Sequence, residues 1–335
     1  MSNEDSRSKT LPSGGRRVTV PAGGRRVTVT ADDGVPLAVR EYGSPDAAVT
    51  AVFVHGHCLH SESWSVLREQ LAGSWGDDVR MVFYDHRGHG ESGHAPAAAY
   101  TIEQLGRDLG AVLATVAPHG PVVLVGHSMG GMAALTYARQ NPRLVGDRLV
   151  GLALISTAAG GLADTGPGRL LRGPALSVLQ AAVRWAPRIA QGSRRLGHNL
   201  CGALVRVAAV GNLSVDPRIV AVAAAMVNDT SVATMCGFLA SFADYDETGT
   251  LTTLASIPSV VVCGSADLLT PFSHSTEMAS RMPAAELVRI EGAGHSVILE
   301  RPAEVAGAIA ALLARVGAAA RGPRTADREL AAAAG

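Results

Sequence analysis

The chain has 335 residues, of which 47% are apolar and 17% are charged, so it is long enough and apolar enough to bury a core. This composition excludes an intrinsically disordered chain and a coiled coil. The 29 basic and 29 acidic residues give a formal net charge of +0, whereas a domain that binds nucleic acid usually carries a basic excess. We therefore expect no nucleic-acid partner.

Cysteine usage and the N-terminal sequence favour a cytoplasmic protein with no stable membrane span. Residues 1–30 contain paired arginines but lack the apolar stretch that a signal peptide needs. The uncharged segment 118–138 is long enough to cross a membrane, yet its prolines, histidines and glycines predict a strand, a turn and a helix. The cysteines lie far apart without a C-x-x-C pair, which favours reduced thiols; they are Cys58, Cys201, Cys236 and Cys263. The sequence leaves the oligomeric state open.

The two ends of the chain are predicted to lie outside the folded core. A nine-residue segment at 12–20 is repeated almost unchanged at 21–29. The second copy is the better candidate for the first strand, because the turn sequence Asp32-Asp33-Gly34 follows it. Residues 1–23 are then a loose N-terminal extension, and 317–335, rich in Ala, Arg and Gly, are expected to form a flexible tail.

Between the ends, short Val-rich segments alternate with helix-like segments. Continuous apolar segments of this kind are typical of strands in a parallel sheet that is buried on both faces. The alternation with helices predicts an α/β fold with a mostly parallel central sheet flanked by helices. Strands are predicted at 51–54, 79–84, 121–125, 149–155 and 259–263, and helices at 102–117 and 132–140.

One long interval breaks this alternation. Residues 158–254 contain no convincing strand and look helical at 170–190 and 217–242. Such an interval is too long for an ordinary crossover between two strands. We interpret it as a helical cap over the C-terminal edge of the sheet, inserted between the core segments 24–157 and 255–316.

A serine lies where a predicted strand passes into a predicted helix. Gly126-His127-Ser128-Met129-Gly130 has the pattern G-x-S-x-G, directly after the strand at 121–125. A serine on so sharp a turn needs a glycine on either side, because the strand and the helix approach each other closely. A helix N-terminus also favours negative charge that develops beside it. The motif therefore predicts that Ser128 is a nucleophile.

With this motif the chain resembles the α/β-hydrolase superfamily over roughly 27–316. Four signature segments follow the order of the family: His55-Gly56, the turn at Ser128, an acid after a later strand, and a late histidine. Residues 85–92, Asp-His-Arg-Gly-His-Gly-Glu-Ser, are also characteristic of the family, in which Arg87 would have a structural role. The resemblance is closest to the capped subgroup with esterases, cofactor-free haloperoxidases (perhydrolases) and epoxide hydrolases. It implies an α/β-hydrolase fold.

Asp267 and His295 are the predicted partners of Ser128. Asp267 follows the strand at 259–263, in a loop that can project a carboxylate into the site. His295 lies in a later Gly-rich loop, which permits a general base to come close to the serine. The three residues also have the chain order Ser, Asp, His that α/β hydrolases use.

Other carboxylates compete with Asp267 for the role of the acid. Asp244, Asp246 and Glu247 are near in sequence, but none of them follows a predicted strand. In this fold the acid can also stand after the strand at 149–155, where the first carboxylate is Asp164. Asp267 is favoured because it directly follows a strand.

Two backbone amides are predicted to form an oxyanion hole. One belongs to Met129, the residue after the nucleophile, and the resemblance assigns the other to His57 in the loop after the third strand. Capped relatives often carry a bulky apolar residue and then Pro after His-Gly, whereas this chain has His57-Cys58. We expect these two side chains to line the pocket; the alternative is an additional titrating group or thiol at the mouth of the site.

Several histidines lie on loops near the predicted site and raise the question of a metal. They are His55, His57, His86 and His89. No H-x-x-x-H helix and no carboxylate at ligand spacing accompanies them. We expect neither a metal nor an organic cofactor.

The predicted triad favours a serine hydrolase that cleaves an ester or a similar acyl bond through an acyl-enzyme. A serine at this position argues against epoxide hydrolysis and dehalogenation, which use a carboxylate nucleophile in this family. The apolar composition of 158–254 favours a fairly apolar small-molecule substrate. Perhydrolysis, C–C bond cleavage or a biosynthetic cyclisation on the same triad, and a low-turnover ligand sensor, are alternatives that the sequence does not separate.

Deletion of residues 1–23 is expected to leave ester turnover and solubility unchanged, because the second copy of the repeat alone supplies the first strand. Steady-state assays of the truncated and full-length chains, with thermal unfolding of both, measure this. An insoluble or inactive truncated chain would contradict the prediction and indicate that both copies pair as strands.

Overall fold

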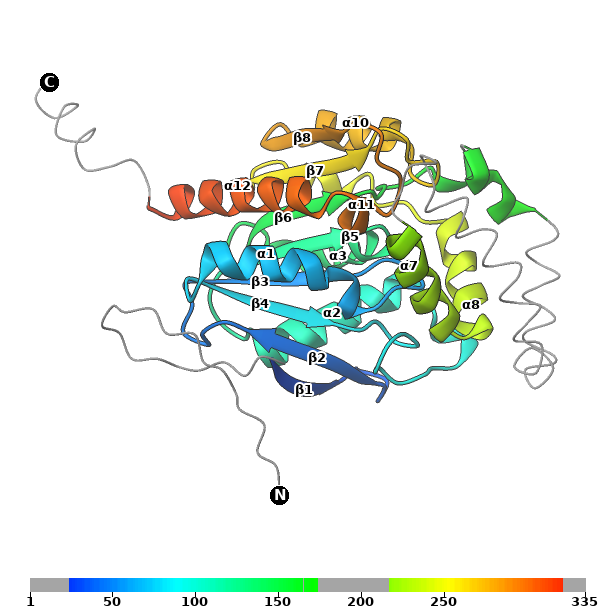
Figure 1. Cartoon of the computed structure of the whole chain (residues 1–335), viewed down its shortest axis with the longest axis horizontal. Helices are drawn as coiled ribbons and strands as arrows, with labels where there is room; N and C mark the ends of the chain where they lie inside the picture. The colour runs from blue at the N-terminus through cyan, green and yellow to red at the C-terminus, as the bar shows by residue number, and fades with distance from the viewer. Residues whose placement is uncertain (1–23, 165, 174–216, 322–335) are drawn as a thin grey trace, which may run out of the picture.

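An eight-stranded, mostly parallel sheet forms the centre of the molecule (Figure 1). The computed structural model describes residues 24–164, 166–173 and 217–321. In spatial order the strands are β1-β2-β4-β3-β5-β6-β7-β8; β2 is antiparallel to both of its neighbours, and the other pairings are parallel. The strands are β1 (Arg25–Thr30), β2 (Pro36–Tyr42), β3 (Val49–Val54), β4 (Val79–Tyr84), β5 (Val122–His127), β6 (Leu149–Ile155), β7 (Ser259–Gly264) and β8 (Ala285–Ile290). The predicted α/β class is confirmed.

Burial explains why the central strands were predictable and the last strand was not. Every residue of β4, β5 and β7 is buried, because helices cover both faces of the sheet, and such strands are continuously apolar. The last strand, β8, lies at the edge of the sheet and exposes charged side chains such as Glu286. Its sequence therefore lacks the continuous apolar pattern, and no strand was predicted at these residues.

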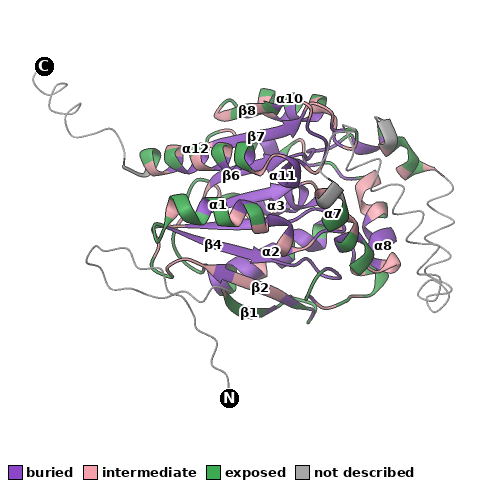
Figure 2. Cartoon of the chain, viewed as in Figure 1, coloured by how far each residue is buried: buried purple, intermediate pink, exposed green. Residues whose placement is uncertain are grey.

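Helices cover the sheet in two layers, and each layer has its own apolar cluster (Figures 1 and 2). Figure 2 shows the buried strands between helices whose outer faces are exposed. One layer contains α1 (Ser65–Trp75), α11 (Val297–Glu300) and α12 (Pro302–Arg321). The other contains α2 (Ile102–Val116), α3 (Met129–Gln140), α9 (Thr250–Thr253) and α10 (Phe272–Arg281). Short 3-10 helices are η1 (Ser61–Trp64), η2 (Ala97–Ala99), η3 (Pro142–Leu144), η4 (Leu162–Asp164) and η5 (Gly166–Arg172).

The helix predicted at 217–242 is two helices, α7 (Pro217–Asp229) and α8 (Val232–Ala243). The break follows from a local cap, because the Ser231 side chain accepts a hydrogen bond from the Thr234 amide and starts a new helix. Of the helix predicted at 170–190, residues 170–172 belong to η5, and 174–190 lie outside the described residues. The boundaries 158–254 of the cap stay a prediction.

The last helix extends further than predicted. α12 continues to Arg321, so residues 317–321 are helical where a flexible tail was expected. Its segment Pro302–Ala319 is long and apolar enough to cross a membrane, with a mean hydropathy of 1.4, and the pair α7 and α8 passes the same test only if its 96° bend is ignored. Apolar side chains of α12 such as Ile309 and Leu312 pack into the core, as expected of the core helix of a folded domain.

A buried ion network fixes the loop that follows β4. The Arg87 guanidinium, which is fully buried, donates two hydrogen bonds of 2.6 Å to Asp108 of α2. It also donates hydrogen bonds of 2.6 and 3.1 Å to Asp33 in the turn between β1 and β2. Because a buried charge must be paired, this cluster ties three distant segments together. Arg87 thus holds the loop that lies beside the candidate site.

Candidate active site

Ser128 lies on a strained turn between β5 and α3. Its backbone has φ +52° and ψ −121°, a conformation that side-chain-bearing residues rarely adopt. The Ser128 amide donates a hydrogen bond of 2.9 Å to the Ile155 carbonyl, and the Thr157 hydroxyl donates one of 2.8 Å to the Ser128 carbonyl. These bonds to the end of β6 hold the serine in place on the turn.

Two glycines make this turn possible. A Cβ atom on Gly130 would lie 2.0 Å from the Val54 carbonyl oxygen, and a Cβ atom on Gly126 would lie 2.6 Å from the Gly130 carbonyl oxygen. Neither distance is tolerable between non-bonded atoms, and backbone atoms cannot move aside as a flexible side chain could. The G-x-S-x-G pattern is therefore a steric requirement of the close approach between α3 and the sheet.

The structure brings Ser128, Asp267 and His295 together from three separate strand ends. His295 Nε2 lies 2.9 Å from Ser128 Oγ, which is hydrogen-bonding distance. On the other side of the ring, His295 Nδ1 lies 2.9 Å from Asp267 Oδ2 and 3.0 Å from Oδ1. A ring that donates through Nδ1 to a carboxylate leaves Nε2 as an acceptor for the serine hydroxyl.

The surroundings of Asp267 keep its carboxylate charged. Burial alone would raise its pKa, but the charge and hydrogen bond of His295 and the donors of Thr270 outweigh burial and lower the pKa to about 2. The amides of Leu269 and Thr270 each donate to Oδ1 at 2.9 Å, and the Thr270 hydroxyl donates to Oδ2 at 2.8 Å. The carboxylate is thus ionised and held in one orientation.

The loop that carries His295 is braced from two sides. The Gly294 amide donates a hydrogen bond of 2.9 Å to Glu300 Oε2, and His127 Nε2 lies 2.9 Å from the His295 carbonyl oxygen. Burial raises the pKa of Glu300, which is 7% exposed. Neither Glu300 nor Thr270 was predicted from the sequence as part of the site. For Thr270 a signal was present, because Asp side chains in turns commonly accept hydrogen bonds from backbone amides a few residues later.

The loop after β3 passes directly over the nucleophile. A Cβ atom on Gly56 would lie 3.2 Å from the Ser128 Cβ, so the backbone that leads to His57 is next to the serine. Cys58, at φ +60°, donates its amide to His89 Nε2 at 3.1 Å, which fixes the far side of this loop. Met129 is fully buried at the start of α3, so both predicted amide donors belong to backbone beside Ser128.

The His57 ring contacts the helix α8. It packs edge-on against Phe238 at 5.8 Å and Phe242 at 5.5 Å between ring centroids. Cys58 joins Val227 and Met235 in a small apolar cluster between the same loop and the helices α7 and α8. His57 and Cys58 therefore face the helices α7 and α8.

Four buried histidines and the partly buried His57 surround the site, and all five are neutral at ordinary pH. Burial lowers the pKa of four of them to about 3 and that of His86 well below its ordinary value; the four are His55, His57, His89 and His127. His55 and His86 are in edge contact at 4.5 Å between centroids. Within 24–164, 166–173 and 217–321, no group of three or more His, Cys, Asp or Glu side chains could hold a metal ion.

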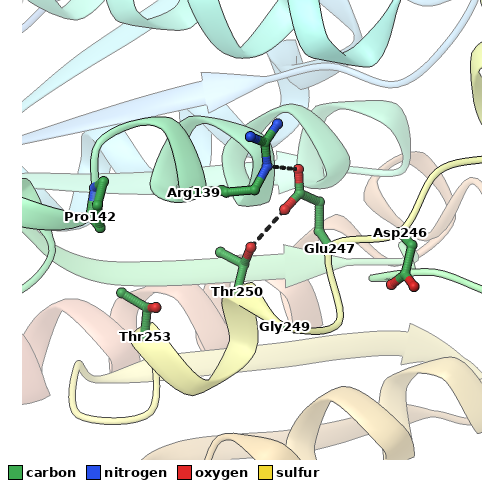
Figure 3. A pocket seen from close by; sticks show the side chains of 7 residues that line it. All are labelled: Arg139, Pro142, Asp246, Glu247, Gly249, Thr250 and Thr253. Atoms are coloured by element: carbon green, nitrogen blue, oxygen red, sulfur yellow. Dashed lines mark hydrogen bonds and ion pairs between the residues drawn. The ribbon is translucent and has the colours of Figure 1, made fainter.

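Three of the four rival acids have partners elsewhere, and the fourth, Asp244, is exposed after the end of α8. Glu247 lines a surface pocket between α3 and α9, where it accepts hydrogen bonds from Arg139 at 2.8 Å and from Thr250 at 2.6 Å (Figure 3). Asp246, beside it, accepts the Thr248 hydroxyl at 2.7 Å. Asp164 pairs with Arg172 at 2.6 Å on the surface.

The fold and the turn at Ser128 define the α/β-hydrolase class. An alpha/beta hydrolase family model matches residues 51–308. The chain belongs to the alpha/beta hydrolase family. The predicted family and fold are therefore confirmed.

Relatives and solved structures agree with this assignment. An uncharacterised protein of Mycobacterium tuberculosis is 29% identical over 276 residues, which cover 75% of this chain and 71% of the relative. The mouse sn-1-specific diacylglycerol lipase ABHD11 is 27% identical over 275 residues, 80% of this chain and 82% of the relative. The structure of a thermophilic esterase from Thermogutta terrifontis has a TM-score of 0.70 and 27% identity, covering 88% of this chain and 99% of the esterase. These similarities support a hydrolase.

The buried histidines predict a steep loss of stability in mild acid. An unfolded histidine binds a proton at about pH 6.5, whereas the buried rings stay neutral until about pH 3. The contribution of the neutral rings to the free energy of unfolding is complete above pH 6.5. It is lost as the pH falls below 6.5, by about 1.4 kcal/mol per pH unit for each ring. Urea unfolding at pH 7.5, 6.0 and 5.0 measures the slope.

A matched pair of variants assigns this slope to the buried rings. His86→Leu should reduce the slope of the unfolding free energy against pH by the equivalent of about one proton taken up on unfolding. His119→Gln, at an exposed position, should leave that slope unchanged. An unfolding free energy that is flat from pH 7.5 to 5.0 would contradict the prediction.

Proposed function

We propose that the protein is a serine hydrolase that cleaves an ester or a similar acyl bond of a fairly apolar small molecule through an acyl-enzyme. The observation that carries the proposal is the continuous hydrogen-bonded series from Ser128 through His295 to Asp267. A nucleophile, a base and a carboxylate that orients the base are the parts that acyl transfer needs.

The path of the proton during the reaction follows from the hydrogen bonds of His295. Its Nε2 takes the proton of Ser128 Oγ as the oxygen attacks the substrate carbonyl, and the imidazolium that forms is stabilised by the Asp267 carboxylate. The same proton then passes to the leaving alkoxide, so the alcohol departs and the acyl group stays on Ser128. A water molecule, deprotonated by Nε2, then attacks the acyl-enzyme; the bond to Ser128 Oγ breaks, Nε2 returns the proton to that oxygen, and the acid is released.

The negative charge on the carbonyl oxygen needs donors that are already in place. In this proposal the amides of Met129 and His57 supply them, and the N-terminus of α3 adds a favourable dipole. The position of Gly56 against Ser128 and the bond from Cys58 to His89 support this role, because they hold the loop close to the nucleophile. Neither donor depends on a side chain.

The expected substrate follows from the surroundings of the site. The apolar side chains that α7 and α8 turn toward the loop after β3 suit an apolar acyl or ring group; they include Val227, Met235 and Phe238. We propose that the enzyme works in the cytoplasm without a cofactor, with a small molecule as its partner. Perhydrolysis, C–C cleavage, cyclisation and ligand sensing are the alternative functions, against which the assays below test ester hydrolysis.

Ser128→Ala should abolish turnover of p-nitrophenyl esters, with a loss of roughly 10⁴- to 10⁶-fold, because the nucleophile is gone. Labelling by a fluorophosphonate probe should be lost with it, while the melting temperature should change little. Turnover within tenfold of wild type would contradict the proposal. An ester rate near zero in a labelled wild-type protein would favour another reaction on the same triad.

Asp267→Asn should keep the fold but lower kcat by roughly 10⁴-fold, because an amide that donates to His295 stabilises the wrong tautomer. Asp164→Asn and Asp244→Asn serve as controls and should stay near wild type, since their carboxylates do not contact His295. If Asp164→Asn were the inactive variant and Asp267→Asn were not, the acid would belong to the end of β6.

A further inference from the structure

Thr270 donates two hydrogen bonds to the Asp267 carboxylate. Its amide donates to Oδ1 at 2.9 Å, and its hydroxyl donates to Oδ2 at 2.8 Å. The residue is 2% exposed, so water cannot replace the hydroxyl if it is removed. One residue therefore binds both oxygens of the acid and fixes the plane of the carboxylate.

The same hydroxyl lies against the general base. Thr270 Oγ1 is 3.3 Å from His295 Nδ1, beside the two carboxylate oxygens at 2.9 and 3.0 Å. The single hydroxyl hydrogen points to Asp267, so only oxygen lone pairs face Nδ1. A ring nitrogen that faces three acceptors must carry its hydrogen, and this leaves Nε2 free to accept the proton of Ser128.

The backbone of Thr270 is restrained so that the hydroxyl keeps this position. Pro271 follows it and disfavours helical backbone at Thr270. The buried thiol of Cys263 lies 3.5 Å from the Thr270 carbonyl oxygen and 3.9 Å from Asp267 Oδ2, and fills the space behind the acid. The hydroxyl is therefore on a buried residue whose carbonyl group and carboxylate partner both contact the same thiol.

We propose that Thr270 is a positioning residue, whose hydroxyl orients the Asp267 carboxylate and completes the set of acceptors that selects the reactive tautomer of His295. The proposal rests on the proposed function. The hydroxyl does not touch the substrate and acts through Asp267. The hydrogen bond from the Thr270 backbone amide to Asp267 Oδ1 does not depend on the side chain. The variants below therefore remove only the contribution of the hydroxyl.

The test compares Thr270→Val, which keeps the shape and loses the hydroxyl, with Thr270→Ser, which keeps the hydroxyl. Thr270→Val should lower kcat for p-nitrophenyl esters by roughly 10- to 100-fold and leave KM within about twofold, because a hydrogen bond to a charged group is lost. Thr270→Ser should recover kcat to within about threefold of wild type. If Thr270→Val does not fold, Thr270→Ala against Thr270→Ser gives the same comparison.

Thr250→Val is the matched control. Thr250 is also buried and its hydroxyl also donates to a carboxylate, Glu247, at 2.6 Å, but this pair lies in the pocket of Figure 3. It should lower the melting temperature and leave kcat unchanged. A loss of kcat in Thr270→Val without one in Thr250→Val excludes a general effect of removing a buried hydrogen bond.

A double-mutant cycle shows whether the hydroxyl acts through the acid. In an Asp267→Asn background, Thr270→Val should change kcat by less than about threefold, because no carboxylate remains to be oriented. The inference is overturned if Thr270→Val alone keeps more than a third of the wild-type kcat, if Thr270→Ser is as impaired as Thr270→Val, or if the two losses multiply. An active Ser128→Ala protein would overturn the proposed function instead, so the two failures are distinguishable.

Discussion

The contact between the first turn of α3 and the end of β3 is the constraint on which the site depends. At Gly130 the helix backbone comes so close to Val54 that no side chain fits between them. The chain must therefore leave β5 and enter α3 within one residue, and Ser128 takes up the strained backbone conformation that results. That turn exposes the hydroxyl, places it at a helix N-terminus, and brings the loop of Gly56 over it.

Burial and pairing together determine where a proton can go. Burial lowers the pKa of His55, His57, His86, His89 and His127, and for His89 and His127 it outweighs the nearby carboxylates Asp85 and Asp267. Among the described histidines near the serine, His295 is the one whose ring contacts a charged carboxylate, Asp267. A positive charge on the His295 ring would face the Asp267 carboxylate, whereas burial makes a positive charge costly on neighbouring rings such as His127, 5.3 Å away between centroids.

The central sheet and the three main side chains of the site were predictable, because each leaves a local signal. Strands buried on both faces are apolar throughout, the glycines around Ser128 follow from steric exclusion, and Asp267 directly follows a strand. The edge strand β8 and the break between α7 and α8 leave weaker signals, since one is half-exposed and the other depends on a single capping serine. Thr270 contacts Asp267 within a single turn, but its contact with His295 joins two loops that are 25 residues apart, and no local pattern specifies such packing.

The position of β8 has a consequence for how the enzyme loses activity. His295 is carried by the loop after this strand, which is hydrogen-bonded to β7 alone and is half-exposed along its length. Edge elements with few buried contacts open locally at a lower free energy than the core from which Ser128 emerges. Opening of β8 separates the base from the nucleophile while the rest of the sheet stays paired. We therefore expect inactivation by heat or denaturant to begin before the loss of secondary structure, and to be reversible for as long as the core persists.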